Sequence, residues 1–156
     1  GEETSQRRST PVSRNRQSVI PKDCILKIPR SRINDIYREL KSLKVENFPN
    51  AAAVLFRVFL ETSLDDYLDK HNLMPLPPTQ PNLHQKLTIA EDHLKTQGTL
   101  SKDELKAVRI ARSSKDNIYS IDTFHAYVHS GFLIPSAAEL KTGWDRLQPF
   151  IEQLWV

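Results

Sequence analysis

Apolar residues recur every three or four positions along most of this 156-residue chain, the spacing that gathers them on one face of an α-helix. No stretch alternates apolar and polar residues in the way that a half-buried strand does. The pattern therefore predicts an all-α bundle of about six helices, some of them short. The predicted helices cover residues 31–43, 50–71, 82–98, 101–112, 121–130 and 136–155.

Capping residues mark several of these helix ends. Ser101 and Glu104 have the spacing of a capping box, and Ser136 and Glu139 repeat it. Pro149 predicts a kink inside the last helix. The other predicted starts are at Ser31, Asn50, Asn82 and Ser120, and the predicted stops are Gly98 and Gly131.

The second predicted helix is apolar on nearly every side, yet it carries Arg57 and Glu61. An all-round apolar helix belongs in the middle of a domain. The two charges lie four residues apart, so they share one face, and buried charges require a partner. We expect a structural ion pair, and a fully buried pair would make Glu61→Ala cost about 3–5 kcal/mol. The alternative is that the pair lines a ligand cleft together with His129.

The segments between and before the helices are polar or rich in proline. Residues 1–20 lack hydrophobic periodicity and predict a flexible basic tail or interdomain linker, which leaves residues 21–156 as the helical bundle domain. Residues 24–28 are expected to form an extended strap. The prolines within residues 74–81 predict an exposed connector of polyproline character, with a ligand for a proline-binding domain as the alternative.

The net charge of +3 at pH 7 is unevenly distributed. Four arginines against two glutamates give residues 1–20 a charge of +2, so the remainder carries only +1. A nearly neutral folded part argues against a basic nucleic-acid surface. Contact with RNA or DNA is expected only through the basic tail or an attached domain, because arginines can pair with phosphates.

Composition also predicts the compartment. Cys24 is the single cysteine and cannot form an internal disulfide, which suits a reducing cytoplasm. No apolar run approaches the roughly 20 residues that span a bilayer, and the polar first residues are not a secretory signal. We expect a cytoplasmic protein without membrane association, metal or other cofactor. Gly1 in place of an initiating methionine predicts a fragment of a larger protein.

The segment 48–52 (FPNAA), followed by Arg57 and Glu61, is similar to the second helix of several bacterial HEPN-type families. The spacer, the helical hairpin, the short helix ending in His129 and the long closing helix fit the same arrangement. Residues 31–156 also resemble the helical domain that follows ParB/sulfiredoxin-like domains in uncharacterised bacterial proteins. The resemblance implies a HEPN-like fold, a homodimer and a role in defence, such as phage defence or a toxin–antitoxin system.

Many HEPN domains cleave RNA through an Arg-x(4–6)-His motif, and His129 can stand for its histidine. The arginine would then fall at 122, 123 or 124, where this chain has Asp122 and two uncharged residues. Asp122 would repel the phosphate whose charge the arginine stabilises. We therefore favour a non-catalytic interaction module over an enzyme. The alternative is a HEPN-type ribonuclease or RNA-binding domain around His129, with Arg109, Arg112 or Lys115 replacing the missing arginine.

His125 and His129 lie four residues apart, and Asp122 is on the same helical face, a spacing that metal ligands use. The chain has neither a Cys-x-x-Cys nor a His-Glu-x-x-His pattern, so we predict no metal. His129 is expected to hydrogen-bond a buried polar group, with His125 outside.

The last predicted helix carries more large apolar area than one core face requires. Tryptophan is favoured at interface hot spots, so we predict a homodimer interface of about 800 Å² per partner here. The alternative is that the helix bends at Pro149 and turns its end inward over the bundle. The interface candidates are Trp144, Phe150, Ile151, Leu154 and Trp155.

Overall fold

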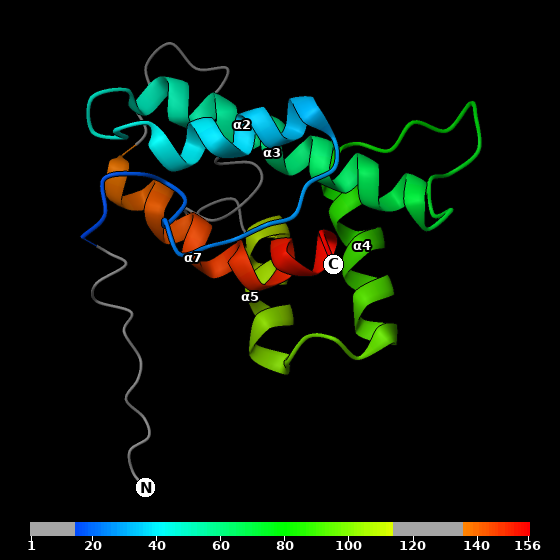
Figure 1. Ribbon diagram of the computed structural model, residues 1–156. Coiled ribbons are helices and arrows are strands. Elements are labelled where there is room, and N and C mark those ends of the chain that lie inside the picture. The colour runs from blue at the N-terminus through cyan, green and yellow to red at the C-terminus, as the bar shows by residue number, and fades with distance from the viewer. Residues whose placement is uncertain (1–14, 114–135) are drawn as a thin grey trace, which may run out of the picture.

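The computed structural model describes residues 15–113 and 136–156, and these two ranges contain five helices and no strand. The prediction of an all-α bundle is confirmed, while the helix predicted over residues 121–130 lies outside the described residues. The helices are α2 (Ser31–Ser42), α3 (Pro49–Lys70), α4 (Leu83–Gln97), α5 (Lys102–Ser113) and α7 (Ala137–Leu154) (Figure 1).

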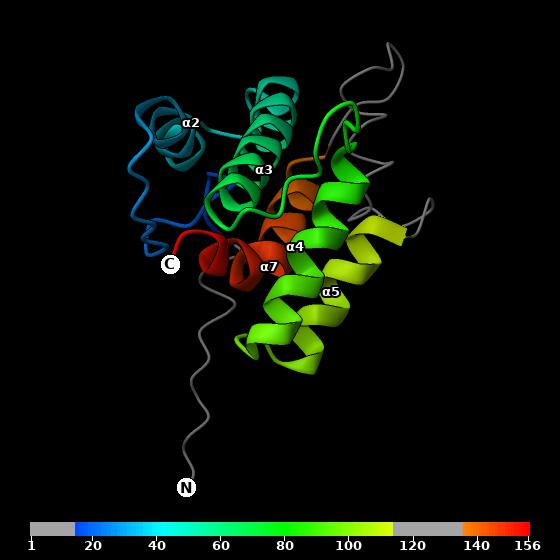
Figure 2. The ribbon, with the colours of Figure 1, turned by 90° about the vertical axis from the view of Figure 1, so that its right-hand side faces the viewer.

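Helix α3 is the central element of the bundle. It packs against α2, α4 and α7, and α5 packs against α4 and α7. Figures 1 and 2 show α2 beside α3, α4 beside α5, and α7 crossing between these two pairs. The last described helix, α7, therefore joins the two pairs, because it contacts α3 of one pair and α5 of the other.

The aromatic contact between α3 and α7 lies at the centre of the core. Phe56 and Phe59 of α3 and Trp144 of α7 are all fully buried. The Trp144 ring lies 5.7 Å from Phe56 and 5.8 Å from Phe59 between centroids, in the tilted arrangements that aromatic pairs favour. These three rings fix α7 across α3.

The predicted capping signals at α4 and α5 are confirmed. The backbone N–H of Ser101 donates to Glu104 Oε1 at 2.8 Å, and that of Glu104 donates to Ser101 Oγ at 3.1 Å. Asn82 caps α4 in a capping box, and α4 ends at Gly98 with a φ of 71°, a conformation that glycine adopts without strain. Ser136 caps α7 by accepting a hydrogen bond from the backbone of Glu139.

Two predicted helix caps are displaced, by one residue in α2 and by two residues in α3. The residue that caps α2 is Arg30 rather than Ser31, and the one that caps α3 is Phe48 rather than Asn50. In α3 the reason is Pro49, which occupies the first helical position. Proline suits this position because a backbone N–H there has no partner within the helix, and because its φ is already helical.

The flexible tail predicted over residues 1–20 extends too far along the chain. Val19 and Ile20 are buried, and the backbone N–H of Val45 donates to Gln17 O at 2.9 Å. Residues 15–20 therefore belong to the packed domain, contrary to the prediction, whereas residues 1–14 lie outside the described part. We call residues 15–30, the segment before α2, the strap.

Tyr37 of α2 holds the middle of the strap. Its hydroxyl donates to Cys24 O at 2.8 Å and accepts from the backbone N–H of Leu26 at 3.0 Å. Cys24 and Leu26 are buried while Ile25 between them is exposed, so the extended strap predicted over residues 24–28 is confirmed. The predicted proline-rich connector is also non-helical, and Leu76 within it is exposed.

No described helix combines the length and apolar character needed to cross a membrane.

Candidate functional site

The two charged residues considered on α3, Arg57 and Glu61, are partly exposed. The Glu61 side chain is 37% exposed and its carboxylate lies 4.0 Å from Lys86 Nζ of α4. The same ammonium lies 2.7 Å from Asp65 Oδ1, a close ion pair that is not aligned as a hydrogen bond. Arg57 is also partly exposed. Glu61 therefore does not meet the condition of full burial under which Glu61→Ala would cost about 3–5 kcal/mol, because α3 has a side that α2, α4 and α7 leave open.

That open side of α3 is apolar in its N-terminal half. At 100° per residue, Ala51, Val54, Leu55 and Val58 fall on one face, and Phe48 lies just before it. Phe48 is 53% and Val54 42% exposed, whereas Leu55 and Val58 are half-buried against the core. We call these five residues the outer face of α3. Helix α3 is therefore apolar all round because α2, α4 and α7 bury three of its sides and the fourth, partly open side is also apolar in its N-terminal half.

The C-terminal half of the same side is acidic. Glu61, Asp65 and Asp69 follow the apolar residues at helical spacing, and Asp66 lies beside them with an ion pair of 2.7 Å to Arg30 of the strap. The open side of α3 therefore changes from apolar to negative along the helix axis.

Among the described residues, the deeply buried charge is that of Glu91 in α4, which the sequence analysis missed. Its side chain is 3% exposed, and its Oε1 accepts from Arg112 Nε of α5 at 2.7 Å. Arg109 of α5 approaches Oε2 at 4.0 Å. A signal was available, since Glu91 lies four residues after Leu87 and three before Leu94, which places it on the inward face of its helix. The pair joins α4 to α5.

A cluster of Tyr67, His71 and His93 connects the end of α3 to α4. The Tyr67 hydroxyl is 2.5 Å from His93 Nδ1, and the His71 ring lies 4.3 Å from that of Tyr67 and 4.9 Å from that of His93. Burial, followed by His93 and Lys70, lowers the pKa of His71, and burial raises the pKa of Tyr67. The four-residue spacing in the sequence places Tyr67 and His71 on one face at the end of α3, but it does not show that His93 of α4 lies beside them. Within residues 15–113 and 136–156 no group of three metal ligands assembles.

The Cys24 thiol is not a nucleophile in this fold. Burial, followed by the nearby Glu152 carboxylate, raises its pKa to about 11. Because the thiolate is the reactive form of cysteine, Cys24 stays protonated and inert at neutral pH.

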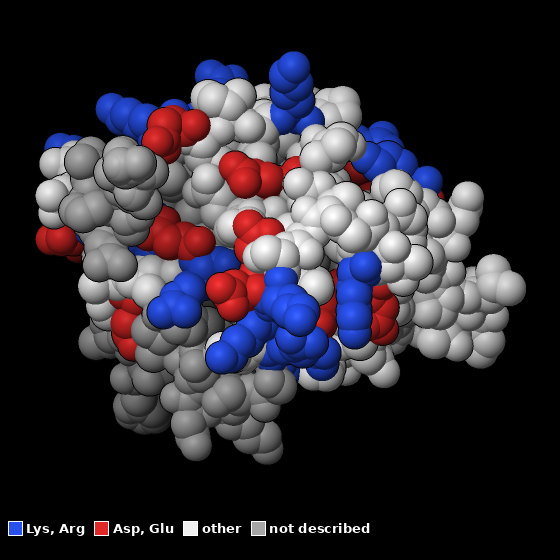
Figure 3. Space-filling model, turned by 90° about the horizontal axis from the view of Figure 1, so that it is seen from below, with Lys and Arg blue, Asp and Glu red and all other residues white. Residues whose placement is uncertain are grey.

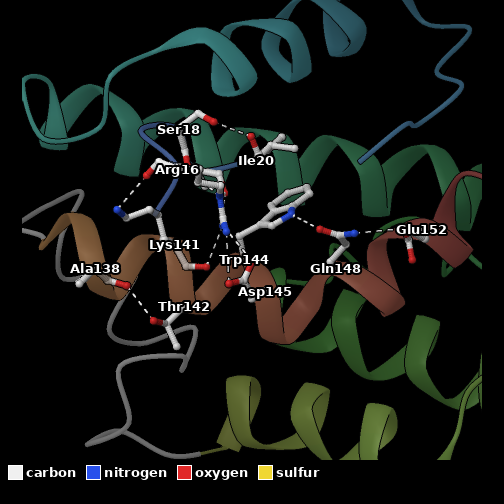
Figure 4. Close-up of polar contacts among 11 residues, drawn as sticks. Arg16, Ser18, Ile20, Ala138, Lys141, Thr142, Trp144, Asp145, Gln148 and Glu152 are labelled. Carbon is white, nitrogen blue, oxygen red and sulfur yellow. Dashed lines mark hydrogen bonds and ion pairs between the residues drawn. The ribbon is translucent and has the colours of Figure 1, made fainter. Parts of the chain in front are cut away.

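Arg16 fastens the beginning of the strap to α7 (Figure 4). Its guanidinium donates to Val19 O at 2.6 Å and to Lys141 O at 3.2 Å, and forms an ion pair of 2.9 Å with Asp145. In return Lys141 Nζ donates to Arg16 O at 3.0 Å. The Arg16 side chain is 9% exposed, so this arginine acts as a structural anchor rather than as part of a loose basic tail.

A groove of about 1110 Å³ opens beside this anchor, between the strap, the end of α2 and α7. We call it the strap groove. A smaller hollow of about 530 Å³ adjoins it and shares Arg16 and Lys44. The charged residues that line the strap groove are Arg16, Lys22, Lys41, Lys44, Asp23 and Asp145.

The predicted interface residues of α7 are buried within the chain. Trp155 Nε1 donates to Ser63 Oγ of α3 at 3.1 Å, and Pro149 lies inside the helix. Of the two predictions for this helix, the structure favours the one in which its end turns inward over the bundle. The residues concerned, all buried, are Trp144, Phe150, Ile151, Leu154 and Trp155.

The remaining predicted site residues, Asp122, His125 and His129, lie outside the described residues. The structure therefore does not test the HEPN-type motif or a contact between His129 and Glu61.

Figure 3 shows basic and acidic side chains interleaved over one face of the molecule, which agrees with the nearly neutral charge of the folded part. Comparison of the chain with protein-family models, curated proteins and solved structures finds no match. Its function is therefore inferred from the surfaces described above.

Proposed function

We propose that this chain is a non-catalytic interaction module that pairs with a second copy of itself through the outer face of α3. The observation that carries the proposal is the exposure of Phe48 and Val54 beside Ala51, Leu55 and Val58. Single exposed apolar residues are common, whereas apolar residues that adjoin one another at the surface and are rimmed by polar ones form a candidate interaction site. The open side of the central helix has this composition.

The charge along α3 favours one geometry for the pair. In a twofold pair each copy offers the same patch, so two α3 helices that meet at Val54 can run antiparallel. The acidic halves, which begin at Glu61, then point away from each other. A parallel arrangement would bring these carboxylates together, and like charges at close range are unfavourable.

The size of the outer face predicts a weak dimer. A stable specific pair buries about 800 Å² on each partner, and the outer face offers one aromatic and four smaller side chains. We therefore expect a dissociation constant on the order of micromolar or weaker, the range of small transient interfaces.

The sequence resemblance supports pairing itself, although not this face in particular. HEPN-type domains commonly pair through the helices that flank their motif, and the all-helical architecture of the described residues is compatible with a HEPN-like domain of a larger bacterial protein. We keep a cytoplasmic setting and a role in defence as parts of this proposal, since both come from the resemblance and the composition alone.

Sedimentation velocity over a hundredfold range of protein concentration tests the proposal. We expect the wild-type protein to associate and Val54→Glu to remain a monomer of 17.9 kDa. Leu76→Glu is the matched control, because it places the same charge on an exposed leucine of the proline-rich connector. Circular dichroism of each variant checks that it is folded.

A wild-type protein that stays monomeric, or a Val54→Glu variant that pairs as the wild type does, would overturn the pairing. The non-catalytic part of the proposal is tested separately with structured and single-stranded RNA, with and without divalent metal. We expect no cleavage. RNA cleavage that His129→Ala abolishes would instead establish the ribonuclease alternative.

A further inference from the structure

We propose that the strap groove binds an acidic peptide segment in an extended conformation. The groove is lined by the strap, α2 and α7, and none of its lining residues belongs to the outer face of α3. This peptide site is therefore independent of the proposed self-association.

The unbalanced charge in the strap groove is positive. Lys22, Lys41 and Lys44 line it against Asp23, because the other two charged residues, Arg16 and Asp145, neutralise each other at 2.9 Å. Lys22 and Lys44 are exposed and form no ion pair within the described residues. An anionic ligand would gain these lysines as partners.

Lys41 is a positioned charge rather than a mobile one. Its ammonium donates to Cys24 O at 2.8 Å and to the Tyr37 hydroxyl at 3.2 Å, and it lies 5.0 Å from the centre of the Tyr37 ring. These contacts hold one cation at the groove wall, so a ligand carboxylate would meet it without the cost of ordering that side chain.

The donors of the groove suit carboxylates and amides better than nucleic acid. The guanidinium fork of Arg16, the group that best holds a phosphate, is already engaged with Val19, Lys141 and Asp145. No aromatic ring is among the described lining residues, and single-stranded nucleic acid binds largely by stacking its bases on such rings. Asn15 and Gln17 line the groove with side-chain amides that both donate and accept, as a peptide backbone requires.

The dimensions of the groove also suit a segment of chain. Its volume of about 1110 Å³ exceeds the roughly 300–1,000 Å³ of small-molecule pockets. An extended acidic peptide would meet Lys22 of the strap and Lys44, which follows α2, because both residues line the strap groove.

Fluorescence anisotropy of a labelled peptide of alternating Glu and Ser tests the proposal on the full chain. We expect saturable binding that weakens with added salt and falls at least tenfold in the double variant Lys22→Glu/Lys44→Glu. Lys102→Glu/Lys106→Glu is the matched control, because it changes the net charge equally at two exposed positions of α5 outside the groove. The control should bind as the wild type does.

Three results would overturn the proposal: no binding to the wild-type protein, equal loss in the two double variants, or tighter binding of a single-stranded RNA of the same length. A peptide with Gln in place of Glu should not bind. Retained peptide binding in Val54→Glu separates this site from the proposed pairing, so each proposal can fail without the other.

Discussion

Replacing Arg112 by alanine removes the closest partner from Glu91, the one charged residue that is buried among the described residues. Arg112 Nε lies 2.7 Å from Glu91 Oε1 and its side chain is 21% exposed. Arg109 would remain at 4.0 Å, but it is 46% exposed, so water screens most of its attraction. The variant leaves a carboxylate buried without an adequate partner.

The expected cost follows from that loss. Breaking a buried pair by removing one partner costs about 3–5 kcal/mol, and the partial exposure of Arg112 places our expectation near 3 kcal/mol. Arg30→Ala is the matched control, because Arg30 also lies 2.7 Å from its partner, Asp66, yet is 62% exposed. An exposed pair contributes at most about 1 kcal/mol, so the two variants differ in burial and not in distance.

Urea unfolding followed by far-UV circular dichroism measures both variants. The midpoint should fall much further in Arg112→Ala than in Arg30→Ala, with unchanged slopes if only stability has changed. The double variant Glu91→Leu/Arg112→Leu should recover most of the loss, because it removes the stranded charge as well as its partner. Equal losses in the two single variants would falsify the argument from burial.

Three further outcomes are expected. Glu61→Ala should cost under about 1 kcal/mol in the same unfolding assay, since this carboxylate is 37% exposed, and a loss of several kcal/mol would contradict this. Cys24 should resist alkylation at pH 8 in the folded protein and react faster in Tyr37→Phe, because this variant removes the hydroxyl that holds the strap. Mass spectrometry measures the rate of labelling, and fast labelling of the wild type would contradict the prediction. The folded-state pKa of His71 is lowered, so unfolding takes up a proton and stability should decline as the pH falls below about 6.5. A melting temperature that declines equally in His71→Gln would show that another group is responsible.

Local signals in the sequence predicted most of the helices. The starts of α4 and α5 are encoded within four residues, as Asn82 with Gln85 and Ser101 with Glu104, so no knowledge of the rest of the fold was needed. The cap of α3 lies two residues before the predicted Asn50, because Pro49 occupies the first helical position.

Long-range contacts explain what the sequence could not reveal. Arg16 was assigned to a flexible tail because its partners, Lys141 and Asp145, lie more than a hundred residues away. The exposure of Glu61 could not be predicted from the sequence for a related reason. Periodicity shows that a helix is apolar all round, but only the packing of its neighbours decides which side stays open.

The contact between Ser63 and Trp155 has a consequence for the synthesis of the chain. These residues are 92 positions apart, so at about 5–20 residues per second the ribosome needs about 5–20 s to proceed from one to the other. For most of that interval Phe56 and Phe59 also lack Trp144, the tryptophan whose ring contacts both of them in the folded chain, while the outer face of α3 is open as well. The nascent chain therefore presents its most apolar helix on two sides at once, and this is the period in which it is most exposed to aggregation and most in need of a chaperone.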